Sequence, residues 1–166
     1  MVGAGLNPAP TKRERKMTTQ ELDFDRSHLG VDYDAGTYPV DKDEVLRYCQ
    51  AIGETAPIYT DEDVARTAGH PGLLVHPTFC AIFVRSFGRP DIKLNFGRTS
   101  FHAGEAIESL APIHVGDTLT ARTRLKEVYA KTGRSGTMAF VVWETSFTNQ
   151  HGQQVVAVQE SMVRRE

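Results

Sequence analysis

The side chains best suited to proton transfer in this sequence gather between residues 53 and 87. Glu54 carries a carboxyl group that could act as an acid or a base, and it equally suits a solvated carboxylate at the end of a helix. Tyr59 follows it, but a phenol with an ordinary pKa of about 10 is a poor base at neutral pH. The alternative for Tyr59 is a half-buried aromatic side chain that makes one hydrogen bond. His76 carries an imidazole whose ordinary pKa of about 6.5 suits proton transfer, or it serves as a hydrogen-bonding residue at the entrance of a helix.

The other histidines and the two cysteines form no metal or nucleotide motif. His70, His114 and His151 fall in loop or turn segments without the spacing of metal ligands. Cys49 and Cys80 lie within apolar helical patterns, which predicts reduced residues of the core. The sequence contains no C-x-x-C, no H-E-x-x-H and no glycine-rich phosphate loop. We therefore expect neither a metal nor a cofactor.

Length and composition indicate one globular domain. With 166 residues and 40% hydrophobic content, the chain can bury a single core. Residues 1–25 include glycine, proline and a basic cluster without apolar periodicity, so we expect a disordered tail there and one domain at residues 26–166. Met17 is a second candidate for the true start.

A net charge of −2 gives no bulk reason to bind nucleic acid or anionic membrane. No apolar run suits a membrane span or a signal peptide, which predicts a cytosolic protein.

Residues 77–87 are predicted to form the central helix. Pro77 suits the first helical position, where its missing N–H costs nothing, and Gly88 followed by Pro90 can end the helix. Apolar side chains occupy nearly every face of this segment, which is typical of a helix enclosed by other elements. These side chains are Phe79, Ile82, Phe83, Val84 and Phe87.

A short strand and two helices are predicted before this segment. The strand covers residues 37–40. Asp41, with a glutamate three residues later, has the pattern of a capping box and opens a helix that ends at Gly53. Thr60 repeats the arrangement and opens a short helix that stops at Gly69.

After Pro90 the apolar pattern alternates, which predicts strands. Glycine-containing turns at residues 133–136 and 150–153 separate the later ones. Turn-linked strands indicate an antiparallel sheet, and an apolar helix earlier in the chain gives that sheet something to curl around. The sequence thus predicts an α+β hot-dog architecture, with one long helix inside a highly curved sheet. The four strands are expected at Arg98–Glu108, Thr118–Ala130, Thr137–Asn149 and Gln154–Arg165.

Several runs occur in a characteristic order: TYPV, AIGETAPIYTDEDVA, GLLVHPTF, FHAGEAIE, PIHVGDTLTA and GRSGTMAFVVWET. Together they resemble the MaoC-like hydratase and dehydratase family, over roughly residues 37–165. The closer similarity is to the FAS1-like, N-terminal-type MaoC dehydratases. That subfamily includes the substrate-binding subunits of two-component (R)-3-hydroxyacyl dehydratases and of steroid-side-chain enoyl-CoA hydratases. The resemblance implies addition or removal of water across the C2–C3 bond of an acyl thioester.

The sequence departs from the catalytic members of that family at two places. Their turn has the form Asp-x-Asn-Pro-aliphatic-His, whereas residues 54–59 read Glu-Thr-Ala-Pro-Ile-Tyr, so glutamate replaces aspartate and Tyr59 replaces histidine. Catalytic members also show His-Gly at the entrance of the central helix, where the glycine N–H helps to hold the thioester oxygen. Pro77 follows His76 here and has no N–H to donate. The N–H of Thr78 or Phe79 could substitute.

The resemblance also suggests substrate contacts. His102 could border the acyl channel, or it is a polar residue at a strand bend marked by Gly104. Phe79, Ile82 and Phe83 could line a tunnel for the acyl chain, although an ordinary core would contain the same residues. A basic group after the central helix could meet the phosphates of a carrier, or it forms a solvated patch; it comprises Arg85, Arg89 and Lys93.

Four functions remain open from the sequence. The leading hypothesis is a subunit that shapes the acyl channel while a MaoC-like partner supplies the Asp/His pair. A second is a self-sufficient homodimeric hydratase that uses Glu54 with His76 or His102. A third, a thioesterase, is disfavoured because residues 77–87 contain no carboxylate. The fourth is a non-catalytic module that binds acyl thioesters. Each predicts a homodimer or heterodimer and an acyl-CoA or acyl-carrier-protein ligand, without fixing the acyl chain or the carrier.

Overall fold

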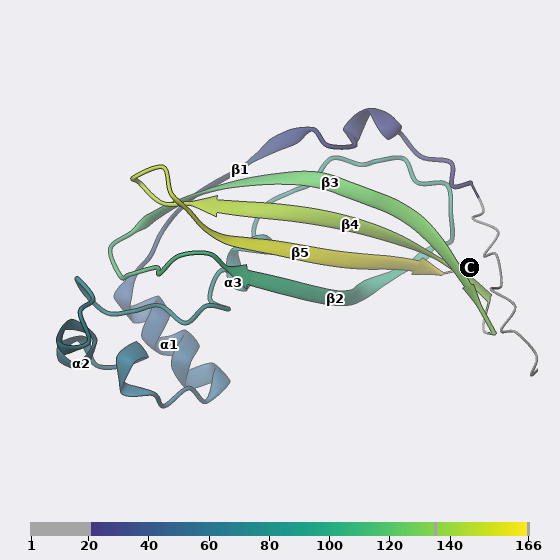
Figure 1. Ribbon diagram of the computed structural model, residues 1–166. Coiled ribbons are helices and arrows are strands. Elements are labelled where there is room, and N and C mark those ends of the chain that lie inside the picture. Colours follow the sequence, from purple (N-terminus) through teal and green to yellow (C-terminus); the bar gives the residue numbers. More distant parts are fainter. Residues whose placement is uncertain (1–20, 135, 166) are drawn as a thin grey trace, which may run out of the picture.

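The computed structural model describes residues 21–134 and 136–165, and its main element is one five-stranded antiparallel sheet (Figure 1). The strand order is β1-β3-β4-β5-β2, so β1 and β2 form the two edges. The helices lie on one side of the curved sheet (Figure 1). The strands are β1 (Asp32–Pro39), β2 (Thr99–Ser109), β3 (Thr118–Gly133), β4 (Gly136–Thr148) and β5 (Gln154–Arg165).

The four predicted strands after Pro90 are confirmed, with bounds that differ by at most three residues. Strands β3, β4 and β5 follow one another through the two predicted turns, and Gly152 has a φ of 78°, which a glycine adopts without strain. Strand β2 instead pairs with β5 at the far edge. Strand β1 starts five residues before the predicted Thr37, because a bulge between Asp34 and Thr37 interrupts the alternation that would have shown it.

The two predicted helices before the central segment are present. Helix α1 (Lys42–Ile52) begins where the Asp41 carboxylate accepts the N–H groups of Asp43 and Glu44, and it ends at Gly53 in the left-handed conformation. The prediction that Thr60 caps the next helix is wrong by one residue. The cap of α2 (Glu62–Thr67) is Asp61, whose carboxylate accepts two N–H groups. A 3-10 turn, Pro57–Tyr59, joins the two helices.

The central helix is much shorter than predicted. Only α3 (Ala81–Val84) is α-helical, and residues 77–80 form tight turns. There the Phe79 N–H bonds to the His76 carbonyl and the Ala81 N–H to the Thr78 carbonyl, each three residues earlier. Aromatic and β-branched side chains dominate this segment and have a low helix propensity, so packing decides its conformation. Ile82 is 40% exposed, which corrects the prediction that every apolar side chain here is enclosed.

Two apolar clusters fill the space under the sheet. The first surrounds α3, where Phe83 stacks on Tyr38 of β1 with ring centroids 4.5 Å apart and contacts Phe147 of β4. Both cysteines are free and buried in it, as predicted. The second cluster packs the extended segment 92–96 against β3, β4 and β5, around Trp143. The chain therefore has two distinct interiors under one sheet.

The predicted tail, residues 1–25, lies outside the described residues as far as residue 20. Its last residues are described, and there Leu22 is buried in the second cluster while the Asp25 N–H bonds to the Ile92 carbonyl. Within the described ranges, no helix is long and apolar enough to cross a membrane.

Candidate functional site

The candidate residue Glu54 sits at the end of α1, where the chain reverses. Its backbone N–H bonds to the Cys49 carbonyl at 2.8 Å, which fixes the first residue after the helix. Its Oε1 atom accepts the Ala56 N–H at 2.8 Å. Oε1 thus stabilises the turn, and Oε2 faces a neighbouring side chain.

That neighbour is His76. The distance from His76 Nε2 to Glu54 Oε2 is 3.4 Å, and each side chain is 22% exposed. Tyr59 lies next to them, with its ring edge-on to the imidazole and ring centroids 5.2 Å apart. The three residues predicted as catalytic candidates therefore come together, although His76 is 22 residues from Glu54 in the sequence.

The orientation of His76 is set by Thr78. The Thr78 N–H donates to His76 Nδ1 at 3.3 Å, and the Thr78 hydroxyl lies 2.8 Å from the same nitrogen. Because Nδ1 accepts, the proton of the neutral imidazole is on Nε2, which faces Glu54. Tyr48 extends the network, since its hydroxyl is 2.7 Å from Thr78 Oγ1. Tyr48 was not predicted as a site residue, and Thr78 was considered only as an N–H donor; a threonine two residues after a histidine is the local signal for this contact.

The expectation that a Thr78 or Phe79 N–H replaces the donor missing at Pro77 is not met. The Thr78 N–H is taken by His76 Nδ1, and the Phe79 N–H bonds to the His76 carbonyl at 2.9 Å. Both groups are used within the turn that opens the segment. Neither is left to bind a thioester oxygen.

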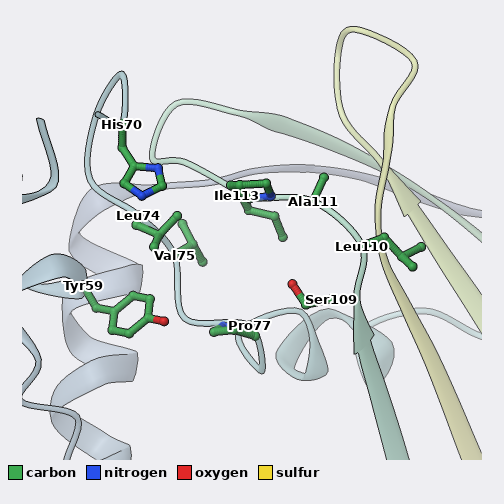
Figure 2. A pocket seen from close by; sticks show the side chains of 10 residues that line it. Tyr59, His70, Leu74, Val75, Pro77, Ser109, Leu110, Ala111 and Ile113 are labelled. Carbon is green, nitrogen blue, oxygen red and sulfur yellow. The ribbon is translucent and has the colours of Figure 1, made fainter. Parts of the chain in front are cut away.

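A cavity of about 320 Å³ lies beside this cluster (Figure 2). Tyr59 and Pro77 form one side, and the end of β2 with the segment after it forms the other. Glu54 and His76 do not line it. The described wall contains one imidazole, one phenol and one serine hydroxyl among apolar groups, and no carboxylate. The lining residues are Tyr59, His70, Leu74, Val75, Pro77, Ser109, Leu110, Ala111, Pro112 and Ile113.

His70, at one end of this cavity, forms a pair with His114. His70 Nδ1 and His114 Nε2 are 3.2 Å apart, and an isolated β-bridge from Leu74 to His114 brings their segments together. Burial lowers the pKa of His114; Asp117 opposes this effect, and the neighbouring His70 adds to it. The sequence placed both histidines in loops without a role, because nothing local signals a contact between residues 44 positions apart.

The remaining predicted residues lie away from this cluster. His102 is on β2, and its Nε2 is 3.7 Å from Glu160 of β5, so it does not meet Glu54. Phe79 and Phe83 belong to the first apolar cluster, Ile82 is partly exposed, and none of the three lines the cavity. Within the described ranges, no three His, Cys, Asp or Glu side chains are grouped to hold a metal ion.

Comparison with known proteins identifies the family of this chain. A family model described as "FAS1-like, dehydratase domain region" matches residues 27–158. A protein of Streptomyces griseus named UPF0336 protein is 29% identical over 116 residues, which are 66% of this chain and 77% of that protein.

Two solved structures share the fold. The C-terminally truncated HadBC (3R-hydroxyacyl-ACP dehydratase) complex from Mycobacterium tuberculosis superposes with a TM-score of 0.64 at 17% identity, over 81% of this chain and 96% of that one. The (R)-hydratase from A. caviae involved in PHA biosynthesis gives 0.63 at 18% identity, over 83% and 96%. The hot-dog fold is thereby confirmed, and the chain belongs to the FAS1-like dehydratase group of the MaoC-like hydratases and dehydratases.

Proposed function

We propose that this chain is one subunit of an (R)-specific enoyl-thioester hydratase or 3-hydroxyacyl-thioester dehydratase. In this assembly it shapes the acyl channel, and a MaoC-like partner supplies the Asp/His pair. The observation that carries the proposal is the wall of the 320 Å³ cavity, whose described residues include no carboxylate. The cavity can hold an apolar acyl group, but it has no described carboxylate, and its one imidazole, that of His70, is paired with His114.

The chemistry of hydration requires three groups: a base for the C2 proton or for water, an acid for the departing hydroxyl, and donors for the thioester oxygen. Tyr59, which faces the cavity, carries a phenol where the catalytic members carry an imidazole. Pro77 has no N–H, and the N–H groups of Thr78 and Phe79 are already bonded. The cavity side of this chain therefore offers substrate contacts and lacks the Asp/His pair and the N–H donor of the catalytic members.

The edge strand β2 provides a surface for the partner. Among the described strands it pairs with β5 alone, so its other edge carries backbone groups that no described strand pairs. Phe101 on this strand and Leu110 just beyond it are 45% and 47% exposed. Leu110 also lines the cavity, so a chain paired along β2 would approach the acyl site. The HadBC structure, whose fold this chain shares, is a complex of dehydratase chains.

A self-sufficient hydratase is the second candidate, and the Glu54–His76 contact of 3.4 Å favours it. A carboxylate that faces an imidazole Nε2 is a standard acid–base arrangement. To act, the pair would need access to the C2–C3 bond from behind Tyr59. A second copy of this chain would then occupy the β2 edge.

The deciding experiment measures hydration of crotonyl and longer enoyl thioesters. The purified chain is assayed alone and after co-expression with MaoC-like chains that carry the intact Asp/His turn. Activity that appears only in the mixture, and survives Glu54→Gln, supports the subunit function. Turnover by the chain alone that is lost in Glu54→Gln or His76→Ala establishes the self-sufficient enzyme instead. Thioester binding without turnover in any mixture identifies a non-catalytic module.

A further inference from the structure

A second cavity, of about 170 Å³, lies in the other interior of the molecule and shares no lining residue with the first. It is bounded by the segment after α3, by β4 and by the ends of β2 and β5. Trp143, Val141 and Met162 form its apolar wall, Ser100 is at its exposed rim, and Arg89 and Arg164 bring positive charge.

Arg89 was predicted to belong to a solvated basic patch, and the structure corrects this. Its side chain is only 18% exposed, and Nη1 lies 2.6 Å from Oε2 of Glu160, which is 8% exposed. The guanidinium carbon lies 5.5 Å from the centre of the Trp143 ring and 5.6 Å from that of Phe87. The group is held between two aromatic rings and one carboxylate.

The hydrogen-bonding capacity of Arg89 is not used up by these contacts. Nε and Nη2 are buried, and neither has a hydrogen-bond partner among the described residues. Glu160 Oε2 is also buried without one, so its 2.6 Å contact with Nη1 is an ion pair that lacks hydrogen-bond geometry. Nε and Nη2 form one edge of the guanidinium, with parallel N–H groups that fit the two oxygens of a carboxylate. A buried donor without a partner is costly, so this edge, on a residue that lines the cavity, suits a bound acceptor.

The charges around the cavity favour an anion. Glu160 balances Arg89, and His102 Nε2 lies 3.7 Å from Glu160 on the opposite side. Asp91, the acid that lines the cavity, is paired with Lys93 at 2.9 Å. Arg164 donates to the Leu94 carbonyl at 2.8 Å and also interacts electrostatically with Asp91. Asp91 and Glu160 thus face three cations, Lys93, Arg164 and Arg89, and the balance of charge around the cavity is positive.

We propose that this cavity binds a small carboxylate, with the two oxygens on Nε and Nη2 of Arg89 and a short aliphatic stem against Trp143 and Met162. The carboxylate is either that of a free short-chain acid or the one at the far end of a dicarboxylic acyl group. The site uses none of the residues of the 320 Å³ cavity and does not depend on the proposed hydratase activity.

Trp143 makes binding directly observable, because it is the single tryptophan of the chain. The full chain is titrated with sodium pentanoate at constant ionic strength, and the matched neutral probe is pentanamide. We expect a saturable change in tryptophan fluorescence with pentanoate and at least a tenfold weaker response with pentanamide. Equal responses to both, or no response to pentanoate at 50 mM, would overturn the proposal.

The variants locate the site. Arg89→Lys keeps the positive charge opposite Glu160 but removes the two-nitrogen edge, so we expect at least tenfold weaker pentanoate binding in a folded protein. Arg85→Gln, four residues earlier and exposed, is the matched control and should bind as the unaltered chain does. Unchanged binding by Arg89→Lys would overturn the proposal, and circular dichroism of each variant verifies that it is folded.

A further arm distinguishes the two sources of the carboxylate. Glutaryl-CoA and butyryl-CoA are compared in the same fluorescence titration. A response to glutaryl-CoA but not to butyryl-CoA, lost in Arg89→Lys, assigns the cavity to the carboxylate at the far end of an acyl group. A response to pentanoate without one to glutaryl-CoA assigns it to a free acid. Both readouts are independent of turnover, so they separate this site from the hydratase question.

Discussion

Tyr59 stands edge-on to His76, with ring planes at 62°, and only the tyrosine of the two lines the cavity. The phenol thus occupies the boundary between the cavity and the Glu54–His76 contact. The catalytic members of the family carry a histidine at the position of Tyr59, so a phenol stands here in place of their imidazole.

Restoring the motif should create activity in the chain alone. We expect Glu54→Asp, Ala56→Asn and Tyr59→His, combined, to raise crotonyl-thioester hydration by about 100-fold over the unaltered chain, at the low end of acid–base catalysis because Pro77 still lacks an N–H. Steady-state hydration assays check this, with Tyr59→Phe as the control that changes the ring without adding a base. No gain in the triple variant would show that more than the base is missing.

The Thr78 contacts should contribute measurably to stability. Thr78→Val removes the hydroxyl that bonds to His76 and Tyr48, and at about 1 kcal/mol for each net hydrogen bond we expect a loss of about 2 kcal/mol. Urea unfolding measures the change. Thr132→Val, which removes an exposed Thr132–Thr137 contact, is the matched control and should stay within about 0.5 kcal/mol of the unaltered chain. Equal effects of the two substitutions would contradict the network.

The buried pair of Glu160 and Arg89 should be far more sensitive than a surface pair. Glu160→Gln leaves the Arg89 charge largely buried without its partner, so we expect a loss of about 3 kcal/mol. Glu62→Gln, which breaks the more exposed ion pairs with Lys42 and Arg66, should cost much less, because water screens these charges. Denaturant midpoints at pH 7 compare the two. Similar losses would mean that water screens the Glu160 site.

Alkaline pH should destabilise the fold through Cys80. Burial raises the pKa of this thiol from 9.0 to about 12, so the unfolded chain loses the proton first. The stability that the neutral thiol contributes is complete below pH 9 and is lost as the pH rises toward 12. At pH 10 this loss is about 1 kcal/mol. Unfolding at pH 7 and pH 10 tests the value, and Cys80→Ala should show a correspondingly smaller pH dependence.

Mild acid should act on the His70–His114 pair. Burial lowers the pKa of His114 below its ordinary 6.5, so the unfolded chain binds a proton there more readily than the folded chain does. The associated stability is present above pH 6.5 and falls as the pH decreases through the lowered value. Thermal unfolding from pH 7.5 to 5 should therefore show a smaller decrease in Tm for His114→Gln. His151→Gln, at an exposed turn, should leave the decrease unchanged.

Local signals in the sequence predicted the elements that local chemistry controls. Asp41 and Gly53 bound α1 as expected, and Gly152 forms the turn between β4 and β5. The central helix was predicted too long because apolar content shows that a segment is buried, not whether it stays helical. Thr60 and Asp61 can both cap a helix, and only the hydrogen bonds distinguish them.

The sites depend on contacts that no local pattern encodes. The sequence identified Glu54, Tyr59 and His76 as candidates through the family resemblance, and the fold brings them together. It missed the contact between Arg89 and Glu160, which are 71 residues apart. That contact requires Glu160 to lie opposite Trp143 in the β4–β5 register, which is set by the whole sheet.

The position of β2 also determines when its edge becomes available during synthesis. This strand precedes β3 in the chain, but its neighbour among the described strands is β5, which is synthesised after β3 and β4. Residues 99–109 therefore have no pairing partner until residues 154–165 have emerged from the ribosome. The β2 edge of the sheet thus forms late in folding, after β5 has been placed.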